Sequence, residues 1–180
     1  QSQRKTAPVS LALEYERATQ VCRQSRKAVA SMFQEARMGR TVDTASAQRL
    51  VDEISDSVAR NANALISLAR LKSADDYTYM HSMAVRALMV SLGRQLGMDE
   101  NSAREIGLAG MLHDMGKAMM PLEVLNKPAK LTDAEYAIMK THPRHGYELL
   151  LEGKGVGEVA LDVTLHHHER PDGKGYPHGL

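Results

Sequence analysis

Apolar residues recur at helical spacing through the N-terminal part of the chain. The pattern in residues 10–38 predicts one long helix that ends at Gly39, because glycine often follows the last helical turn. A second helix is predicted from an N-cap at Asp43 to about Leu71. The apolar stripes consist of Leu11, Leu13, Val21, Val29, Met32 and Phe33 in the first helix and of Leu50, Ile54, Val58, Leu65 and Leu68 in the second. We therefore expect residues 1–72 to form an αα-hairpin that serves as a packing scaffold.

Capping-box patterns divide the remainder of the chain into shorter helices. In each pattern a Ser or Thr is followed three residues later by an acidic side chain: Ser73 with Asp76, Ser102 with Glu105, and Thr132 with Glu135. One face of the first of these helices carries His81, Val85, Leu88, Leu92 and Leu96. The helix after Ser102 is expected to carry His113 and to end near Gly116.

Prolines and glycines predict where the later elements are interrupted. A Pro-containing loop leaves room for a short helix at residues 122–125, and Pro143 interrupts the helix that begins at Thr132. The helix resumes to Leu151, and a last apolar helix is predicted for residues 159–168 before a Gly- and Pro-rich loop. The pattern contains no internal repeat and no convincing strand, so the predicted fold class is all-α.

Composition agrees with packed helices and narrows the functional classes. The 180 residues include one Phe, no Trp and 11 Met, and such a core is typical of helices rather than of a β-sandwich. A net charge of +1 without a basic stripe argues against binding to a nucleic-acid polymer. The single cysteine, Cys22, excludes an internal disulfide and favours a reducing compartment, so we expect a cytoplasmic location. The sequence contains no stretch of about 18 apolar residues, so no membrane span is predicted.

Histidines carry the main functional signal, because all eight lie between residues 81 and 178. His145, His166 and His178 are interpreted as solvated or neighbouring side chains. The remaining imidazoles, which we expect to converge with the Asp114 carboxylate, are those of His81, His113, His142, His167 and His168. Burial of imidazole and carboxylate groups without partners is costly, and a first-row metal ion would offset that cost.

This set exceeds what one metal ion needs, whereas two metal ions bridged by Asp114 would use all of it. Such a pair can clamp a phosphoryl centre, and Lys117 could then contact a phosphate oxygen as a point charge. A core of unrelated histidines and a site for a single metal ion are the alternatives.

Two motifs resemble a known family. The pair His113-Asp114 followed by Gly116-Lys117 is similar to the HD superfamily of metal-dependent phosphohydrolases. The segment of residues 167–177, HHERPDGKGYP, closely resembles the signature of the HD-GYP subgroup. With His81 and with His142-Pro143 and Gly146, the resemblance covers roughly residues 73–180. The preceding hairpin looks like the linker helices of HD-GYP proteins that carry an additional N-terminal domain.

The resemblance implies an HD-superfamily helical bundle at residues 73–180 that hydrolyses the bacterial second messenger cyclic di-GMP to pGpG or on to GMP. It implies metal ligands at His81, His113, Asp114, His142, His167 and His168, with Asp114 as the bridge. Asp114 and Lys117 would be the catalytic residues, and the cofactors would be two divalent metal ions, iron or manganese before zinc or nickel.

Substrate-binding residues implied by the resemblance are Lys117, Arg144 and Tyr176, although a solvent-facing role is favoured for Arg144. The GYP loop of Gly175, Tyr176 and Pro177 would form the rim of the pocket and contact GGDEF diguanylate cyclase domains, with an ordinary surface loop as the alternative. Gly173 and Gly175 are expected to supply positive φ angles.

Two departures from the family pattern modify these expectations. Trinuclear members have a Glu four residues before the first metal-binding His, and Tyr77 occupies that position here, so a binuclear site is predicted. The family also supplies a further Asp ligand from beyond the GYP loop, so we expect the sequence to be cut short at its C-terminus.

Other functions remain open at this stage. A non-catalytic module that senses cyclic di-GMP or docks on cyclase domains is the main alternative, and a hydrolase of other nucleotides is a third. A homodimer through the N-terminal helices is also expected.

Overall fold

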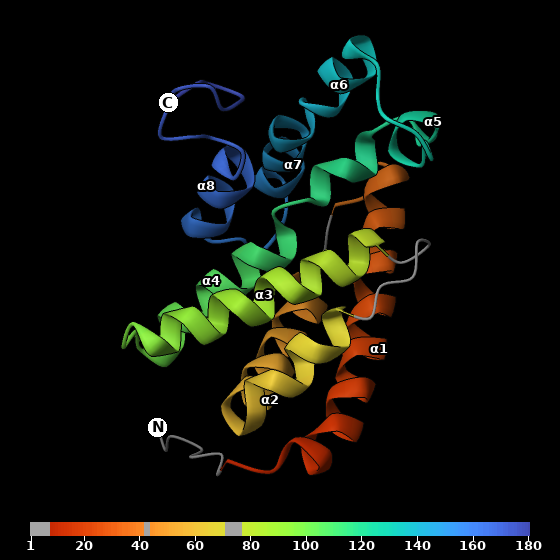
Figure 1. Ribbon diagram of the computed structural model, residues 1–180. Helices are drawn as coiled ribbons and strands as arrows, with labels where there is room; N and C mark the ends of the chain where they lie inside the picture. The colour runs from red at the N-terminus through yellow and green to blue at the C-terminus, as the bar shows by residue number, and fades with distance from the viewer. Residues whose placement is uncertain (1–7, 42–43, 71–76) are drawn as a thin grey trace. The chain divides into compact units, whose positions relative to one another are not determined.

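The computed structural model describes residues 8–41, 44–70 and 77–180. Within these ranges every regular element is a helix (Figure 1). In chain order they are α1 (Leu11–Arg37), α2 (Thr44–Arg70), α3 (Tyr77–Gln95), α4 (Glu100–Leu112), the 3-10 helix η2 (Met115–Met119), α5 (Leu122–Leu125), α6 (Asp133–Met139), α7 (His142–Leu151) and α8 (Glu158–His166). The all-α prediction is confirmed.

Among the described helices, none combines the length and the apolar character that crossing a membrane requires.

The chain divides into two compact units. The first unit contains residues 1–30 and 45–111, and the second contains residues 31–44 and 112–180. The boundary predicted at residue 72, the N-cap at Asp43 and the capping box at Ser73 lie outside the described residues and stay predictions.

The core of the first unit is built from α1, α2 and α3. Its buried side chains are Ala18, Val21, Cys22, Ile54, Val58, Ala64, Leu65, Met83, Ala87 and Val90. The predicted stripes are therefore buried over much of their length, but Leu11 and Leu13 at the start of α1 are exposed. The α-hairpin prediction holds for the two long helices, although α2 is broken at Asn61, where φ is −164° and ψ is 98°. At this break the Asn61 side chain donates to the carbonyl of Val9.

The close contact between α3 and α4 determines which face of α3 is buried. A Cβ at Gly93 of α3 would lie 2.6 Å from the Ile106 side chain of α4, and a Cβ at Gly107 would lie 2.7 Å from the Val90 side chain. These glycines let α3 and α4 approach closely, side by side in Figure 1. The predicted leucine face points elsewhere, and Leu88, Leu92 and Leu96 are exposed.

Helix boundaries follow the predictions in the second unit better than in the first. Thr132 and Glu135 form the predicted capping box of α6, α5 has the predicted bounds, and Pro143 lies in the first turn of α7. Gly39 has a φ of 68° directly after α1, as expected for a helix stop. The capping box at Ser102 was wrong, because α4 begins earlier and the Asp99 side chain accepts from the N–H groups of Asn101 and Ser102.

Candidate functional site

The HD pair lies in a turn and not on a helix, which corrects the prediction. Helix α4 ends at Leu112, and His113 and Asp114 form the turn that leads into η2. Both side chains are buried, with Asp114 only 2% exposed. The backbone of Asp114 has a φ of −98° and a ψ of 8°, a conformation that active-site residues often adopt. The chain therefore leaves α4 early and directs both side chains into the second unit.

Two glycines allow η2, α7 and α8 to meet at this turn. A Cβ at Gly116 would overlap the carbonyl oxygen of His142, and it would lie 2.5 Å from the backbone nitrogen of Gly146. A Cβ at Gly146 would lie 2.8 Å from the side chain of Thr164 on α8. Only residues without side chains fit this contact, so the sequence brings Asp114 against α7 through backbone packing.

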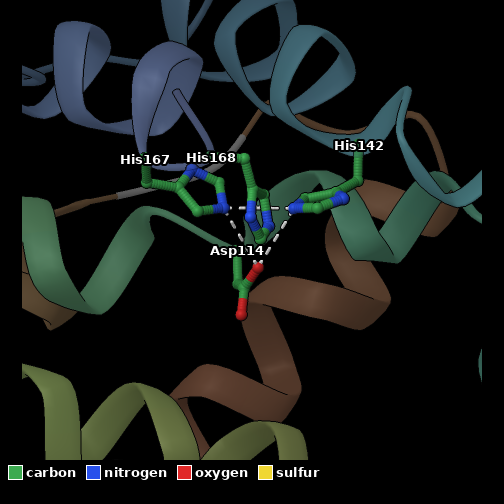
Figure 2. Close-up of side chains that lie close together, drawn as sticks. All are labelled: Asp114, His142, His167 and His168. Atoms are coloured by element: carbon green, nitrogen blue, oxygen red, sulfur yellow. Dashed lines mark hydrogen bonds and ion pairs between the residues drawn. The ribbon is translucent and has the colours of Figure 1, made fainter. Parts of the chain in front are cut away.

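Three imidazoles from α7 and the end of α8 face the Asp114 carboxylate (Figure 2). His142 begins α7, and His167 and His168 directly follow α8. One ligand atom from each of these histidines and one oxygen of Asp114 all lie within 4.8 Å of one another. The Nε2 atom of His142 is 3.3 Å from Asp114 Oδ1, and that of His167 is 3.6 Å from the same oxygen.

Hydrogen bonds fix the tautomers of two of these rings. Nδ1 of His142 is 2.7 Å from the carbonyl oxygen of Met139, and Nδ1 of His167 is 3.0 Å from that of Thr164. A carbonyl can only accept, so both Nδ1 atoms carry the proton and, in the neutral rings, both Nε2 atoms carry a lone pair. These Nε2 atoms are 3.1 Å apart.

The third imidazole, that of His168, is neutral at neutral pH. Burial, together with the nearby His167 and His142, lowers the pKa of His168 to about 4. Lone pairs of the imidazoles and a carboxylate oxygen thus converge on one point. They repel one another unless a cation lies among them, and this donor set suits first-row transition metals. The cluster fits a metal ion.

The second oxygen of Asp114 faces a different set of side chains. Oδ2 is 3.3 Å from His113 Nε2 and accepts from Lys117 Nζ at 2.7 Å. Burial on its own would raise the pKa of Asp114, but its contacts with the side chains of His113, His142 and His167 outweigh burial and hold that pKa well below its usual range. The carboxylate is therefore ionised, with each oxygen directed at separate nitrogen atoms.

The other predicted site residues are placed as follows. His81 lies on α3 in the first unit and is half-buried, so its membership in the metal site stays a prediction. Arg144 is largely exposed and pairs with Glu148 at 3.4 Å, in agreement with a solvent-facing side chain. His166 pairs with Asp162 at 2.9 Å, away from the Asp114 carboxylate contacts.

Residues of the GYP loop fold back onto the end of α8. Tyr176 stacks on His168, with ring centroids 4.5 Å apart and an interplanar angle of 20°. Gly173 has the expected positive φ of 68°, but the expectation for Gly175 was wrong. Gly175 is required instead for close approach, because a Cβ there would lie 2.5 Å from the backbone of Glu169 and Arg170.

One residue of this segment was missed by the sequence interpretation. The Glu169 carboxylate accepts from the backbone N–H groups of His178, Gly179 and Leu180. The available signal was an acidic residue that directly precedes a Gly- and Pro-rich loop, where free backbone N–H groups need acceptors.

Comparisons with known proteins identify the family to which the chain is similar. A family described as the HD domain matches residues 49–180. The cyclic di-GMP phosphodiesterase PA4108 of Pseudomonas aeruginosa is 54% identical over 176 residues, which are 97% of this chain and 42% of the relative.

Two further relatives match shorter segments. The cyclic di-GMP phosphodiesterase response regulator RpfG of Xanthomonas campestris is 41% identical over 137 residues, 74% of this chain and 36% of the relative. The 3'3'-cGAMP-specific phosphodiesterase 1 of Vibrio cholerae is 36% identical over 104 residues, 58% of this chain and 24% of the relative. The chain thus spans less than half the length of each of these relatives.

Proposed function

Because this chain belongs to the HD-domain family, as its resemblance to the HD superfamily predicted, we propose that it is a metal-dependent phosphodiesterase that hydrolyses cyclic di-GMP. The products would be pGpG, GMP or both. The names of the relatives from Pseudomonas and Xanthomonas support this choice of substrate.

The convergence of acceptors around Asp114 Oδ1 is the observation that carries the proposal. His142, His167 and His168 would hold one divalent cation together with this oxygen. His113 and Oδ2 would contribute to a second cation, with His81 as a further proposed ligand. In this assignment Asp114 is the bridge, and its two oxygens already face different nitrogen atoms.

Two divalent cations supply a water of lowered pKa and a clamp for the oxygens of a phosphoryl group. The chain's own residues prepare the site for this chemistry. Lys117 Nζ donates one hydrogen bond to Asp114, and an ammonium group has two further N–H donors for a phosphate oxygen. Lys117 would therefore hold the anionic substrate close to the bridging carboxylate, and Tyr176, which stacks on His168, would contact the substrate beside it.

Mixed imidazole and carboxylate ligands suit iron, manganese, zinc and nickel, and no thiolate contributes among the clustered residues described. Iron or manganese is proposed before zinc or nickel on the family resemblance alone. Cys22 is a free, buried thiol in the first unit, which agrees with the proposed cytoplasmic location. Contact between the loop around Pro177 and GGDEF domains and a homodimer through α1 and α2 are further proposals.

Hydrolysis by the full-length protein tests the function. The protein is loaded with Fe(II) or Mn(II), and cyclic di-GMP and 3'3'-cGAMP are supplied in parallel, because relatives carry both names. We expect linear products from cyclic di-GMP. Binding of cyclic di-GMP without any product, under every metal, would reject the enzyme and favour a sensing module. Turnover of 3'3'-cGAMP without turnover of cyclic di-GMP would reject cyclic di-GMP as the substrate.

A further inference from the structure

The imidazoles around Asp114 Oδ1 differ in how their orientation is fixed. His142 and His167 each donate from Nδ1 to a backbone carbonyl, which prevents rotation of the ring. For His168, the part of the chain that the structure describes supplies no hydrogen bond to the ring. Its contacts are with other rings: His142 edge-on at 5.0 Å, His167 at 4.2 Å and Tyr176 stacked at 4.5 Å.

Tyr176 is brought to this position by a closed loop. Its backbone N–H donates to the carbonyl of His168 at 3.2 Å, so ring and backbone both contact the same residue. Glu169 closes the loop from the opposite end, where its Oε1 accepts from the N–H of His178 at 2.6 Å and its Oε2 accepts from the N–H of Leu180 at 3.0 Å. Gly175 permits the fold-back.

We propose that Tyr176 is a positioning residue whose ring holds the His168 imidazole toward Asp114, and that Glu169 keeps Tyr176 in place by closing the loop. This inference rests on the proposed metal site. The Tyr176 ring replaces, for His168, the hydrogen bond that orients each of the other two rings. The contact is between ring faces, so the aromatic ring is required and the hydroxyl group is not.

Manganese binding to the full-length protein, measured by titration calorimetry, tests the proposal. Tyr176→Leu removes the ring and is expected to weaken binding of Mn²⁺ roughly tenfold, because residues that orient metal ligands typically contribute 10- to 100-fold in affinity. Tyr176→Phe keeps the ring and should bind as the wild type does. Tyr15→Leu, the same change on the exposed side of α1, is the matched control and should bind unchanged.

A second measurement does not require metal. In the metal-free protein, stacking on Tyr176 is expected to shift the ring-proton NMR signals of His168 upfield. Tyr176→Leu and Glu169→Ala should both remove this shift, whereas Tyr176→Phe should retain it. If the upfield shift of the His168 ring protons persisted in Glu169→Ala, the proposed role of Glu169 in closing the loop would be overturned.

Each remaining outcome identifies which proposal fails. Absence of Mn²⁺ binding by the wild-type protein overturns the metal site and this inference together. Normal binding by the wild type and equally tight binding by Tyr176→Leu overturn only the positioning role. Weak binding by Tyr176→Phe would show that the hydroxyl group acts instead of the ring.

Discussion

Among the residues that the structure describes, two carboxylates are buried, Glu14 in the first unit and Asp114 in the second, and their surroundings differ. Glu14 is fully buried, accepts two hydrogen bonds from the Arg60 guanidinium at 2.7 and 2.9 Å, and accepts a third from Ser57 at 2.8 Å. The chain itself provides the positive charge. Asp114 has Lys117 at one oxygen, but its other oxygen faces the Nε2 atoms of His142 and His167.

This difference separates a structural carboxylate from a binding carboxylate. Burial on its own would raise the pKa of both groups, and in both cases the neighbouring side chains outweigh burial and lower it, so the direction of the shift does not distinguish them. The chemistry of the neighbours does. The hydrogen-bonding capacity of the Glu14 carboxylate is satisfied by donors of the chain itself. The Nε2 acceptors beside Asp114 Oδ1 instead need a cation from outside the chain.

The largest effect is expected from Asp114→Ala. Loss of the shared carboxylate should lower turnover of cyclic di-GMP by about 1,000-fold, since metal ions contribute several kcal/mol to such reactions. Turnover by the metal-loaded full-length protein is the measurement, and metal content is determined alongside it. Retained activity would contradict the bridging role. The free energy of unfolding of the metal-free protein should fall less in Asp114→Ala than in Glu14→Ala.

Glu14→Ala should act on stability and not on catalysis. It leaves the Arg60 guanidinium without its carboxylate, and because Arg60 is 19% exposed we expect a loss of about 3 kcal/mol, at the low end for a broken buried pair. Denaturant unfolding of the metal-free protein measures the loss. Equal destabilisation by Asp114→Ala, with normal metal binding, would remove the distinction between the two carboxylates.

Gly116→Ala tests whether backbone packing places Asp114. The new Cβ would overlap the His142 carbonyl oxygen, so we expect about 2 kcal/mol of destabilisation and weaker metal binding. Gly97→Ala is the control. Gly97 has open space around it but a φ of 76°, so that change should cost about 1 kcal/mol through the backbone and leave metal binding intact. Tight metal binding by Gly116→Ala would contradict the packing argument.

The smallest effect concerns the pH dependence of the Glu14 contribution. The pKa of Glu14 is lowered in the folded protein from an ordinary value of 4.5, so its stabilisation is complete above that value and is lost as pH falls through the folded pKa. The difference in unfolding free energy between wild type and Glu14→Gln should therefore be constant near neutral pH and shrink below about pH 4.5. A difference that grows on acidification would be inconsistent with this pairing.

Local sequence patterns predicted most of the helices, because spacing, caps and prolines act within a few residues. Thr132, Pro143 and Gly39 have the roles assigned to them. The same reasoning failed where a partner element decides the outcome. Leu88 and its neighbours on α3 matched an amphipathic stripe, yet the close contact at Gly93 buries another face.

The site was predicted by residue type better than by local structure. The expected cluster does form, from Asp114, His142, His167 and His168. The HD pair nevertheless lies in a turn, because the apolar residues keep helical spacing past Leu112 whereas helix α4 ends at that residue. Gly116 and Gly146 determine this geometry through contacts between distant backbones, which no local pattern reveals. The place of His81 in the site stays a prediction.

The end of α8 has a consequence for the two histidines that follow it. Successive side chains along a continuing α-helix diverge by about 100°, so adjacent residues rarely serve one ligand. Helix α8 ends at His166 with His167 as its C-cap, and the rings of His167 and His168, which follow the helix, are only 4.2 Å apart. The point at which this helix ends is thus part of the geometry of the proposed cation site, and one added helical residue is expected to separate the neighbouring imidazoles.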